Sequence, residues 1–142
     1  MFEAPFIKPW RIDDTHIDHY KHVNNVAYLA QVEKLAWAHS NTLGLHFADY
    51  QAQNRGMVIK RHELNYHLPS HLGDELHCAT WIVHCDDRLT LKRQFQFICP
   101  ERKKTVFDAL TTFVCVSLDT GMPKRMPENF KTIYGNACIT PV

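Results

Sequence analysis

The stretch from Asn25 to Leu43 restricts the fold most, because its predicted helix is apolar around nearly its whole circumference. At about 100° per residue, one side of this helix is apolar and a neighbouring set of residues widens that side considerably. The residues concerned are Val26, Leu29, Ala30, Ala36 and Trp37, with Tyr28, Val32 and Leu35 beside them. A helix of this kind is normally wrapped by other structure rather than resting on a surface. We therefore expect the rest of the chain to enclose it.

Capping residues mark both ends of the predicted helix. Asn24 or Asn25 can act as the N-cap, because an asparagine side chain accepts hydrogen bonds from the first turn. Gly44 stands just past Leu43, where a residue in the left-handed conformation commonly ends a helix. These signals predict a helix from residue 25 to residue 43.

Runs rich in β-branched and aromatic residues predict the strands that would enclose the helix. One short run precedes the helix at residues 6–12, and four longer runs follow it at 57–68, 76–84, 89–99 and 105–118. A strand, a long helix and then four antiparallel strands is an α+β order. The sequence thus predicts a single domain over residues 1–142, with an antiparallel sheet wrapped around a long central helix.

Composition excludes several classes of protein. The 142 residues are 45% hydrophobic and carry a formal charge of +1, which favours neither nucleic acid nor an anionic membrane as partner. No segment is long and apolar enough to span a bilayer, and the first residues lack a secretory pattern, so we expect a cytoplasmic protein. The five cysteines form no Cys-x-x-Cys pair, which favours core cysteines over a metal site, and we expect no bound metal.

Asp18 is the candidate reactive group, because it lies seven residues before Asn25 on the loop that enters the helix. The first turn of a helix has backbone N–H groups without internal partners, and the helix dipole adds partial positive charge there. An acyl carbonyl at that end would have its developing oxyanion stabilised while the carboxylate acts. Spacing alone favours a structural carboxylate that only stabilises the helix entry.

A resemblance to a known family favours the catalytic role of Asp18 over the structural one. The segment from Asp18 through His22-Val23-Asn24-Asn25 to Tyr28 and Glu33 resembles the signature of the 4-hydroxybenzoyl-CoA thioesterase-like hotdog family. Residues 63–76, with Tyr66, Pro69 and Gly73-Asp74, resemble the second strand and its turn in that family. Residues 113–123 resemble the last strand and its turn. The resemblance covers nearly the whole chain in the family's order.

The resemblance implies a hotdog fold and roles for two residues. Asp18 matches the family's catalytic carboxylate, which acts as general base or as nucleophile, and Asn25 matches the position whose backbone N–H polarises the thioester carbonyl. It also implies a homodimer, or a dimer of dimers, with the site between two subunits. Coenzyme A would be part of the substrate, so no separate cofactor is expected. The chain departs from the family at His16, often Asp, and at Lys21, mostly Gly.

Four further residues are candidates for substrate binding. Glu33 falls on the apolar side of the helix, so we expect a buried carboxylate that must be paired. It either holds the helix to the loop or to the partner subunit by hydrogen bonds, or it faces a substrate pocket. Tyr28 is a core residue or a pocket residue, and His22 lies within the matching motif. Arg88, on the predicted turn before the third long strand, can pair with the phosphates of coenzyme A.

The leading hypothesis is therefore hydrolysis of an acyl-CoA to a free acid and coenzyme A. One alternative is a non-catalytic acyl-CoA-binding or scaffold protein, in which Asp18 is only structural. Another is enoyl-CoA hydratase or dehydratase chemistry, for which Asp18 and His22 have the wrong spacing.

Overall fold

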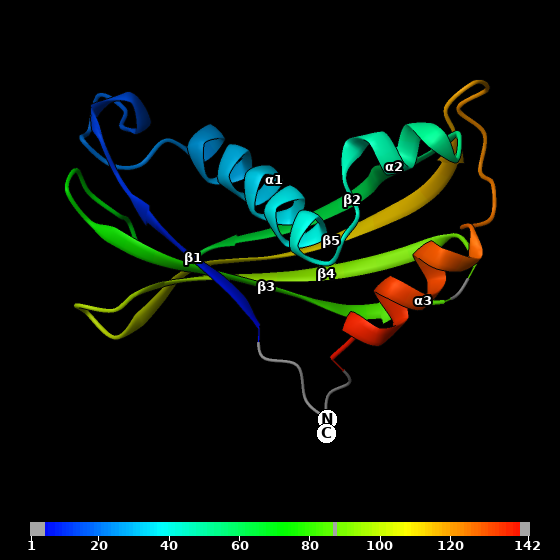
Figure 1. Ribbon diagram of the computed structural model, residues 1–142. Coiled ribbons are helices and arrows are strands. Elements are labelled where there is room, and N and C mark those ends of the chain that lie inside the picture. Colours follow the sequence, from blue (N-terminus) through cyan, green and yellow to red (C-terminus); the bar gives the residue numbers. More distant parts are fainter. Residues whose placement is uncertain (1–4, 87, 140–142) are drawn as a thin grey trace.

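A curved five-stranded antiparallel sheet forms the body of the protein (Figure 1). The computed structural model describes residues 5–86 and 88–139. The ends of the predicted 1–142 domain lie outside the described residues, and so does Asp87, in the predicted turn before the third long strand. The strands lie in the order β1-β3-β4-β5-β2. Their bounds are β1 Phe6–Arg11, β2 Arg55–Tyr66, β3 Glu75–Cys85, β4 Thr90–Cys99 and β5 Lys104–Ser117. All five predicted strands are confirmed, with each end within two residues of its predicted position.

Side-chain alternation decides which face of the sheet is covered. In β4, Leu91, Phe95 and Phe97 are buried, whereas the intervening Gln94 and Gln96 are half-buried. The sequence predicts this alternation, because successive side chains of a strand point to opposite faces. Cys78, Cys99 and Cys115 are buried, as expected for small core side chains, and Cys85 and Cys138 are half-buried.

The long helix α1, Asn25–Thr42, lies across the covered face of the sheet. Asn24 is the N-cap, since its side chain accepts a hydrogen bond from the Val26 N–H, and Gly44 follows the helix with φ +94°. The side that packs on the sheet contributes Tyr28, Val32, Leu35, His39 and Ser40.

The expectation that this chain encloses α1 is wrong. The opposite side of α1 is open, with Val26 72%, Leu29 36% and Trp37 40% exposed. A helix lying on a single sheet can bury only the stripe that faces the sheet, and the apolar residues of α1 extend beyond that stripe. Part of its apolar surface is therefore left uncovered by the described residues.

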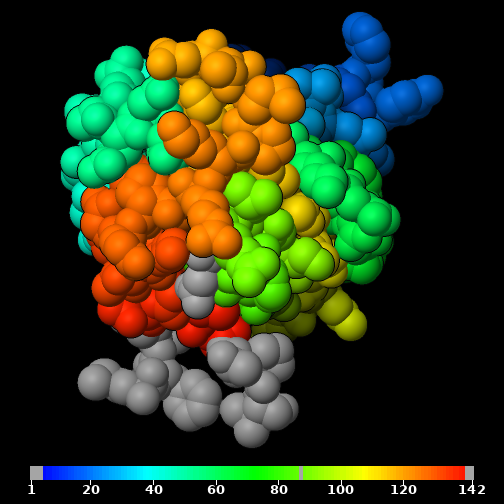
Figure 2. Space-filling view, turned by 90° about the vertical axis from the view of Figure 1, so that its right-hand side faces the viewer, coloured from blue at the N-terminus to red at the C-terminus, as the bar shows by residue number. Residues whose placement is uncertain are grey.

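Two short helices at one end of the sheet were not predicted. Helix α2, Phe47–Ala52, follows α1, and helix α3, Glu128–Ala137, lies in the C-terminal segment that the sequence left unassigned. Figure 2 shows α2, α3 and the chain between β5 and α3 side by side over this end of the molecule. Beneath them, Tyr50, Phe130 and Tyr134 form a second core with residues of the sheet. This end of the molecule is closed.

Candidate active site

The loop before α1 is a tight turn that fixes Asp18. Ile17 and Val23 form an isolated antiparallel bridge, so the residues between them reverse the chain. The Asp18 N–H donates to the His22 carbonyl at 2.8 Å, and the Lys21 N–H donates to the Asp18 carbonyl at 3.0 Å. The turn is therefore closed by its own backbone.

The carboxylate of Asp18 is oriented by the same turn. Its Oδ1 accepts hydrogen bonds from the backbone N–H groups of Tyr20, at 2.8 Å, and of His22, at 3.2 Å. The side chain is exposed, and within residues 5–86 and 88–139 no group donates a hydrogen bond to Oδ2. One oxygen is held in place, and the other can approach water or a substrate.

Lys21 occupies the position at which the family mostly has glycine. Its φ is +61°, in the left-handed region that glycine adopts without steric penalty. The turn thus keeps the conformation that a glycine would favour, and the non-glycine residue carries a strain of about 1 kcal/mol. The backbone at residue 21 therefore has the left-handed conformation even though the residue is lysine.

The start of α1 is anchored to the rest of the fold. The Val23 N–H donates to the Ser70 carbonyl at 2.9 Å, and the Asn24 N–H donates to the His16 carbonyl at 2.7 Å. The Asn25 N–H has no acceptor among the residues that the structure describes. A fixed helix start with an available N–H can accept an oxygen atom that carries negative charge.

His22 and Tyr28 lie near this helix start in different settings. The exposed ring of His22 meets the ring of His71 edge to face, with 5.1 Å between centroids. Tyr28 is buried, stacks on Phe107 at 4.9 Å, and donates its hydroxyl hydrogen bond to Ser70 at 3.0 Å. Burial raises the pKa of the Tyr28 phenol, so it stays protonated near neutral pH. A substrate contact by either residue stays a prediction.

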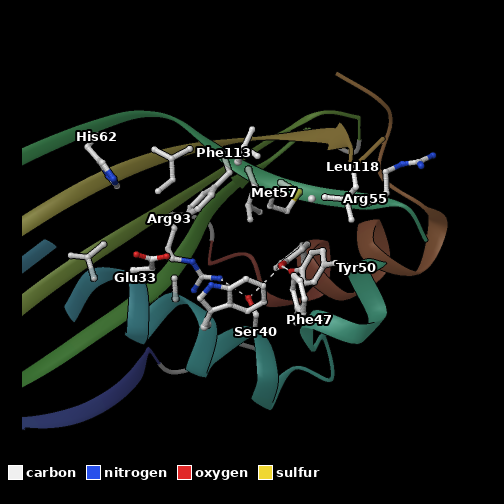
Figure 3. Close-up of a pocket in the computed structure, with 18 of the residues that line it drawn as sticks. Glu33, Ser40, Phe47, Tyr50, Arg55, Met57, His62, Arg93, Phe113 and Leu118 are labelled. Carbon is white, nitrogen blue, oxygen red and sulfur yellow. Dashed lines mark hydrogen bonds between the residues drawn. The ribbon is translucent and has the colours of Figure 1, made fainter. Parts of the chain in front are cut away.

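A cavity of about 490 Å³ runs along the open side of α1 (Figure 3). It begins at Leu29, one turn beyond Asn25, and continues to Ser40 near the other end of the helix. Strand β2 faces α1 across it, β4 and β5 form its floor, and α2 lies at its end. Its apolar lining includes Leu29, Val32, Ala36, Trp37, Phe47, Met57, Val58, Ile59, Leu91 and Phe113.

Polar side chains gather at the closed end of this cavity. The guanidinium of Arg93 donates from Nη1 to His39 Nδ1 at 2.6 Å and from Nη2 to Ser40 Oγ at 3.4 Å. The hydroxyl of Tyr134 bonds to those of Ser40 and Tyr50. All but His39 line the cavity. We call Arg93, His39, Ser40, Tyr50 and Tyr134 the polar cluster.

Burial sets the charges in the polar cluster. Burial, and then the charge of Arg93, lower the pKa of His39 to about 4, so its ring is neutral and Nδ1 is an acceptor. Burial lowers the pKa of Arg93 to about 10, which leaves its guanidinium charged at neutral pH. Burial also raises the pKa of Tyr50, so its hydroxyl stays protonated. The cluster therefore contains a cation with neutral neighbours.

Sequence reasoning missed the polar cluster. Arg93 has the same parity in β4 as the buried Leu91 and Phe95, which is the signal that could have placed it on the covered face. No local pattern links it to His39, Ser40 or Tyr134, because these residues come from different parts of the chain.

The predicted substrate residues are not gathered at one place. Glu33 lines the cavity but is exposed, so the expectation of a buried carboxylate is wrong: it lies on the uncovered side of α1. Arg88 is exposed in the turn between β3 and β4, where its N–H donates to Asp86 Oδ1 at 2.9 Å, and it does not line the cavity. Asp18, Asn25, His22 and Tyr28 belong to the helix start.

No group of three or more His, Cys, Asp or Glu side chains is placed to hold a metal ion in the part of the chain that the structure describes. Among the described helices, none is long and apolar enough to cross a membrane.

Comparison with known proteins places these features in a family context. Residues 11–133 match the model of the thioesterase-like superfamily. The long-chain acyl-CoA thioesterase FadM of Escherichia coli strain K12 is 33% identical over 109 residues, which are 74% of this chain and 78% of FadM.

Solved structures share the fold. A Staphylococcus aureus protein, SAV2348, determined in complex with CoA, superposes with a TM-score of 0.88 at 16% identity, covering 100% of this chain and 90% of that one. The 1,4-dihydroxy-2-naphthoyl-CoA thioesterase Slr0204 of Synechocystis gives 0.83 at 14% identity, covering 94% and 97%. YbaW, a probable thioesterase of E. coli, gives 0.78 at 23% identity, covering 92% and 97%. The predicted α+β hotdog fold is confirmed.

Proposed function

The chain belongs to the thioesterase-like superfamily and is an acyl-CoA thioesterase, and on this premise we propose that Asp18 and the Asn25 N–H cleave the thioester of a long-chain acyl-CoA. One observation carries the proposal. The helix whose start presents both groups also forms one wall of a largely apolar cavity, which begins one turn further along. A thioester at the helix start can therefore extend its acyl chain along α1.

The proposed reaction uses the two groups in succession. The free Oδ2 of Asp18 takes a proton from water, and the resulting hydroxide attacks the thioester carbonyl carbon. The carbonyl oxygen becomes an oxyanion that accepts a hydrogen bond from the Asn25 N–H. The tetrahedral intermediate then collapses, the C–S bond breaks, and coenzyme A leaves as a thiolate that takes up a proton. In the alternative, nucleophilic mechanism, Oδ2 attacks the carbonyl carbon directly and coenzyme A leaves, which gives a mixed anhydride. Water then hydrolyses this anhydride.

The long-chain preference is supported by the cavity and by the relative FadM, whose name states long-chain acyl-CoA. A volume of about 490 Å³ with mainly aliphatic and aromatic walls suits an extended hydrocarbon chain. Burial of each methylene group contributes about 0.8 kcal/mol, so a longer chain binds more tightly until the cavity is filled.

Coenzyme A would lie at the surface, outside the cavity. His22 is exposed beside the helix start and is proposed to contact the part of coenzyme A near the thioester. Arg88 is proposed to pair with a phosphate, as guanidinium groups commonly do. Tyr28 is proposed to act beneath the site, where its hydrogen bond to Ser70 supports the helix start. No separate cofactor takes part, and a cytoplasmic location stays a prediction.

The enzyme is proposed to work as a homodimer or a dimer of dimers. Val58 and Ile59 of the edge strand β2 are 46% and 48% exposed, and they lie across the cavity from the open side of α1. Edge strands and large apolar patches of this kind are usually covered by a partner. A second copy placed there would cover Trp37 and Glu33 and complete the walls of the cavity.

Release of free thiol from acyl-CoA substrates of increasing chain length tests the proposal. We expect turnover of long saturated acyl-CoA, with kcat/KM rising with chain length before it levels off. Binding of these compounds without release of thiol from any of them would contradict the proposal and favour a non-catalytic acyl-CoA-binding protein.

Single-turnover hydrolysis in oxygen-18 water separates the two roles of Asp18. If Asp18 acts as base, the label enters only the product acid. If Asp18 acts as nucleophile and water attacks the anhydride at the Asp18 carbon, the label enters Asp18 and the product acid keeps an unlabelled oxygen from the enzyme. Attack at the acyl carbon would label the product acid, as in the base mechanism, so label in Asp18 identifies the nucleophilic path. Mass spectrometry of the acid and of the peptide containing Asp18 reads both outcomes.

A further inference from the structure

Arg93 is a buried cation at the closed end of an apolar cavity. Its side chain is 1% exposed, yet it lines the cavity. Figure 3 shows it reaching from β4 across the cavity floor toward Ser40 on α1. Its Nε has no hydrogen-bond partner among the described residues. The buried guanidinium therefore keeps one donor unpaired beside the cavity.

The neighbours of Arg93 do not neutralise its charge. Its two hydrogen bonds go to the uncharged His39 and Ser40. None of the ion pairs formed within residues 5–86 and 88–139 includes Arg93. Glu33 also lines the cavity, but it is exposed and forms no ion pair with Arg93 among the described residues. The buried charge has no carboxylate of its own chain as partner.

A buried, unpaired cation favours an anionic ligand. Removing a guanidinium from water costs several kcal/mol, and in this fold that cost is already incurred before any ligand binds. A carboxylate that enters the cavity would meet the preformed charge, the free Nε–H and the hydroxyls of the polar cluster. Hydrogen bonds between guanidinium and carboxylate are among the strongest in proteins, because both groups are charged and their geometries match.

We propose that the closed end of the cavity binds a carboxylate at the far end of the acyl chain, so that the preferred substrates are long-chain ω-carboxyacyl-CoA thioesters. This inference rests on the proposed function for the position of the thioester at the helix start. The apolar middle of the cavity holds the methylene chain, and Arg93 with Ser40 and Tyr134 holds the terminal carboxylate. An unsubstituted chain of equal length leaves the Arg93 Nε–H without a partner.

Paired substrates of equal chain length test the proposal. We compare the mono-CoA thioester of hexadecanedioic acid with hexadecanoyl-CoA and 16-hydroxyhexadecanoyl-CoA, using the full chain. The wild type should favour the ω-carboxyl substrate in kcat/KM by at least about tenfold, because the plain chain leaves a buried donor unpaired and the hydroxyl group brings no negative charge to Arg93. In Arg93→Met, that preference should be lost, so that the ω-carboxyl substrate is turned over no faster than the other two, as expected when one partner of a buried charged pair is removed.

Controls separate recognition from folding. Arg11→Met removes an arginine that is exposed on β1 and does not line the cavity, so the preference should persist. If Arg93→Met does not fold, Arg93→Lys keeps the charge but loses the paired donors, and it should show an intermediate preference. Equal kcat/KM for the three substrates in the wild type, or a preference for the plain or hydroxylated chain, would overturn the proposal.

A binding measurement keeps this proposal separate from the catalytic one. Thermal unfolding of the wild type is followed with free hexadecanoic acid and with 1-hexadecanol, which has the same chain but no carboxylate. The acid should raise Tm more than the alcohol even if no acyl-CoA is hydrolysed, in which case the proposed function fails and the carboxylate site stands. An equal or smaller shift with the acid would overturn the carboxylate site, whether or not the protein hydrolyses acyl-CoA.

Discussion

At the N-terminal end of α1, the exposed carboxylate of Asp18 is held by backbone N–H groups of its own turn. At the C-terminal end, the buried guanidinium of Arg93 is held by His39 and Ser40 from α1, beside hydroxyls from α2 and α3. The first end depends on a few consecutive residues, whereas the second depends on the assembled fold. Changes at the first end should therefore alter turnover more than stability, and changes at the second should alter stability more.

Asp18→Asn should give the largest effect on turnover. The amide oxygen can still accept from the Tyr20 and His22 N–H groups, so the turn is kept, but the amide is neither a base nor a nucleophile. We expect kcat to fall by about 10² to 10⁴, the usual contribution of such a group. Release of thiol measures kcat, and thermal unfolding should show a nearly unchanged Tm.

Asp14→Asn is the matched control for this change. Asp14 is exposed in the short 3₁₀ turn Asp14–His16, a few residues before Asp18. This variant should keep full activity. Full activity in Asp18→Asn would contradict the catalytic role, and a large loss of Tm would contradict the local nature of this end.

Acid should lower the free energy of unfolding through His39, near the C-terminal end of α1. Burial and Arg93 lower the pKa of His39 from 6.5 to about 4, so the unfolded chain binds a proton at a higher pH than the folded chain. The resulting stabilisation is complete above pH 6.5 and is lost as the pH falls through about 4. It amounts to about 3 kcal/mol in the free energy of unfolding. Urea unfolding across this pH window measures it.

His39→Gln provides the comparison for the pH dependence. Glutamine offers an oxygen to Arg93 but does not titrate, so the free energy of unfolding should depend less on pH between 6.5 and 4. If wild type and variant lose stability in parallel, His39 is not the group responsible.

Asn24→Ala tests how far the start of α1 contributes to stability. Loss of the side-chain hydrogen bond to the Val26 N–H, 2.9 Å long, should lower the free energy of unfolding by about 1 kcal/mol. Asn24→Ser should restore most of it, because serine also caps helices well. Asn41→Ala in the last turn is the control and should have a smaller effect. Chemical denaturation measures all three variants.

Lys21→Gly should give the smallest effect. Glycine relieves the left-handed strain but adds entropy to the unfolded chain, so we expect a net gain of about 0.5 kcal/mol. Lys103→Gly, at φ +54° in the turn before β5, should give a similar gain. A changed kcat in Lys21→Gly but not in Lys103→Gly would indicate that the conformation of Asp18 depends on Lys21.

The sequence predicts the parts of this molecule that depend on local patterns. The strands were predicted from β-branched and aromatic runs, and α1 was predicted from its capping residues. The Asp18 turn was predicted from a contiguous motif. The short α2 and α3 were missed, because helices of six and ten residues form mainly through packing against other elements. The polar cluster was missed because His39, Arg93 and Tyr134 meet only in the folded chain. The exposed side of α1 was misjudged because periodicity shows that a surface is apolar and not which chain covers it.

The strand order has a consequence for synthesis of the protein on the ribosome. Strand β2 pairs only with β5 in the sheet, although Tyr66 precedes Ser117 by 51 residues. At roughly 5–20 residues per second, several seconds pass before the partner strand of β2 is complete. During this time the nascent chain displays Val58 and Ile59 on a strand without neighbours, which makes it a target for chaperones and for aggregation. The wall of the cavity is thus among the last parts of the fold to form, and synonymous codons that slow translation between β2 and β5 would lengthen its exposure.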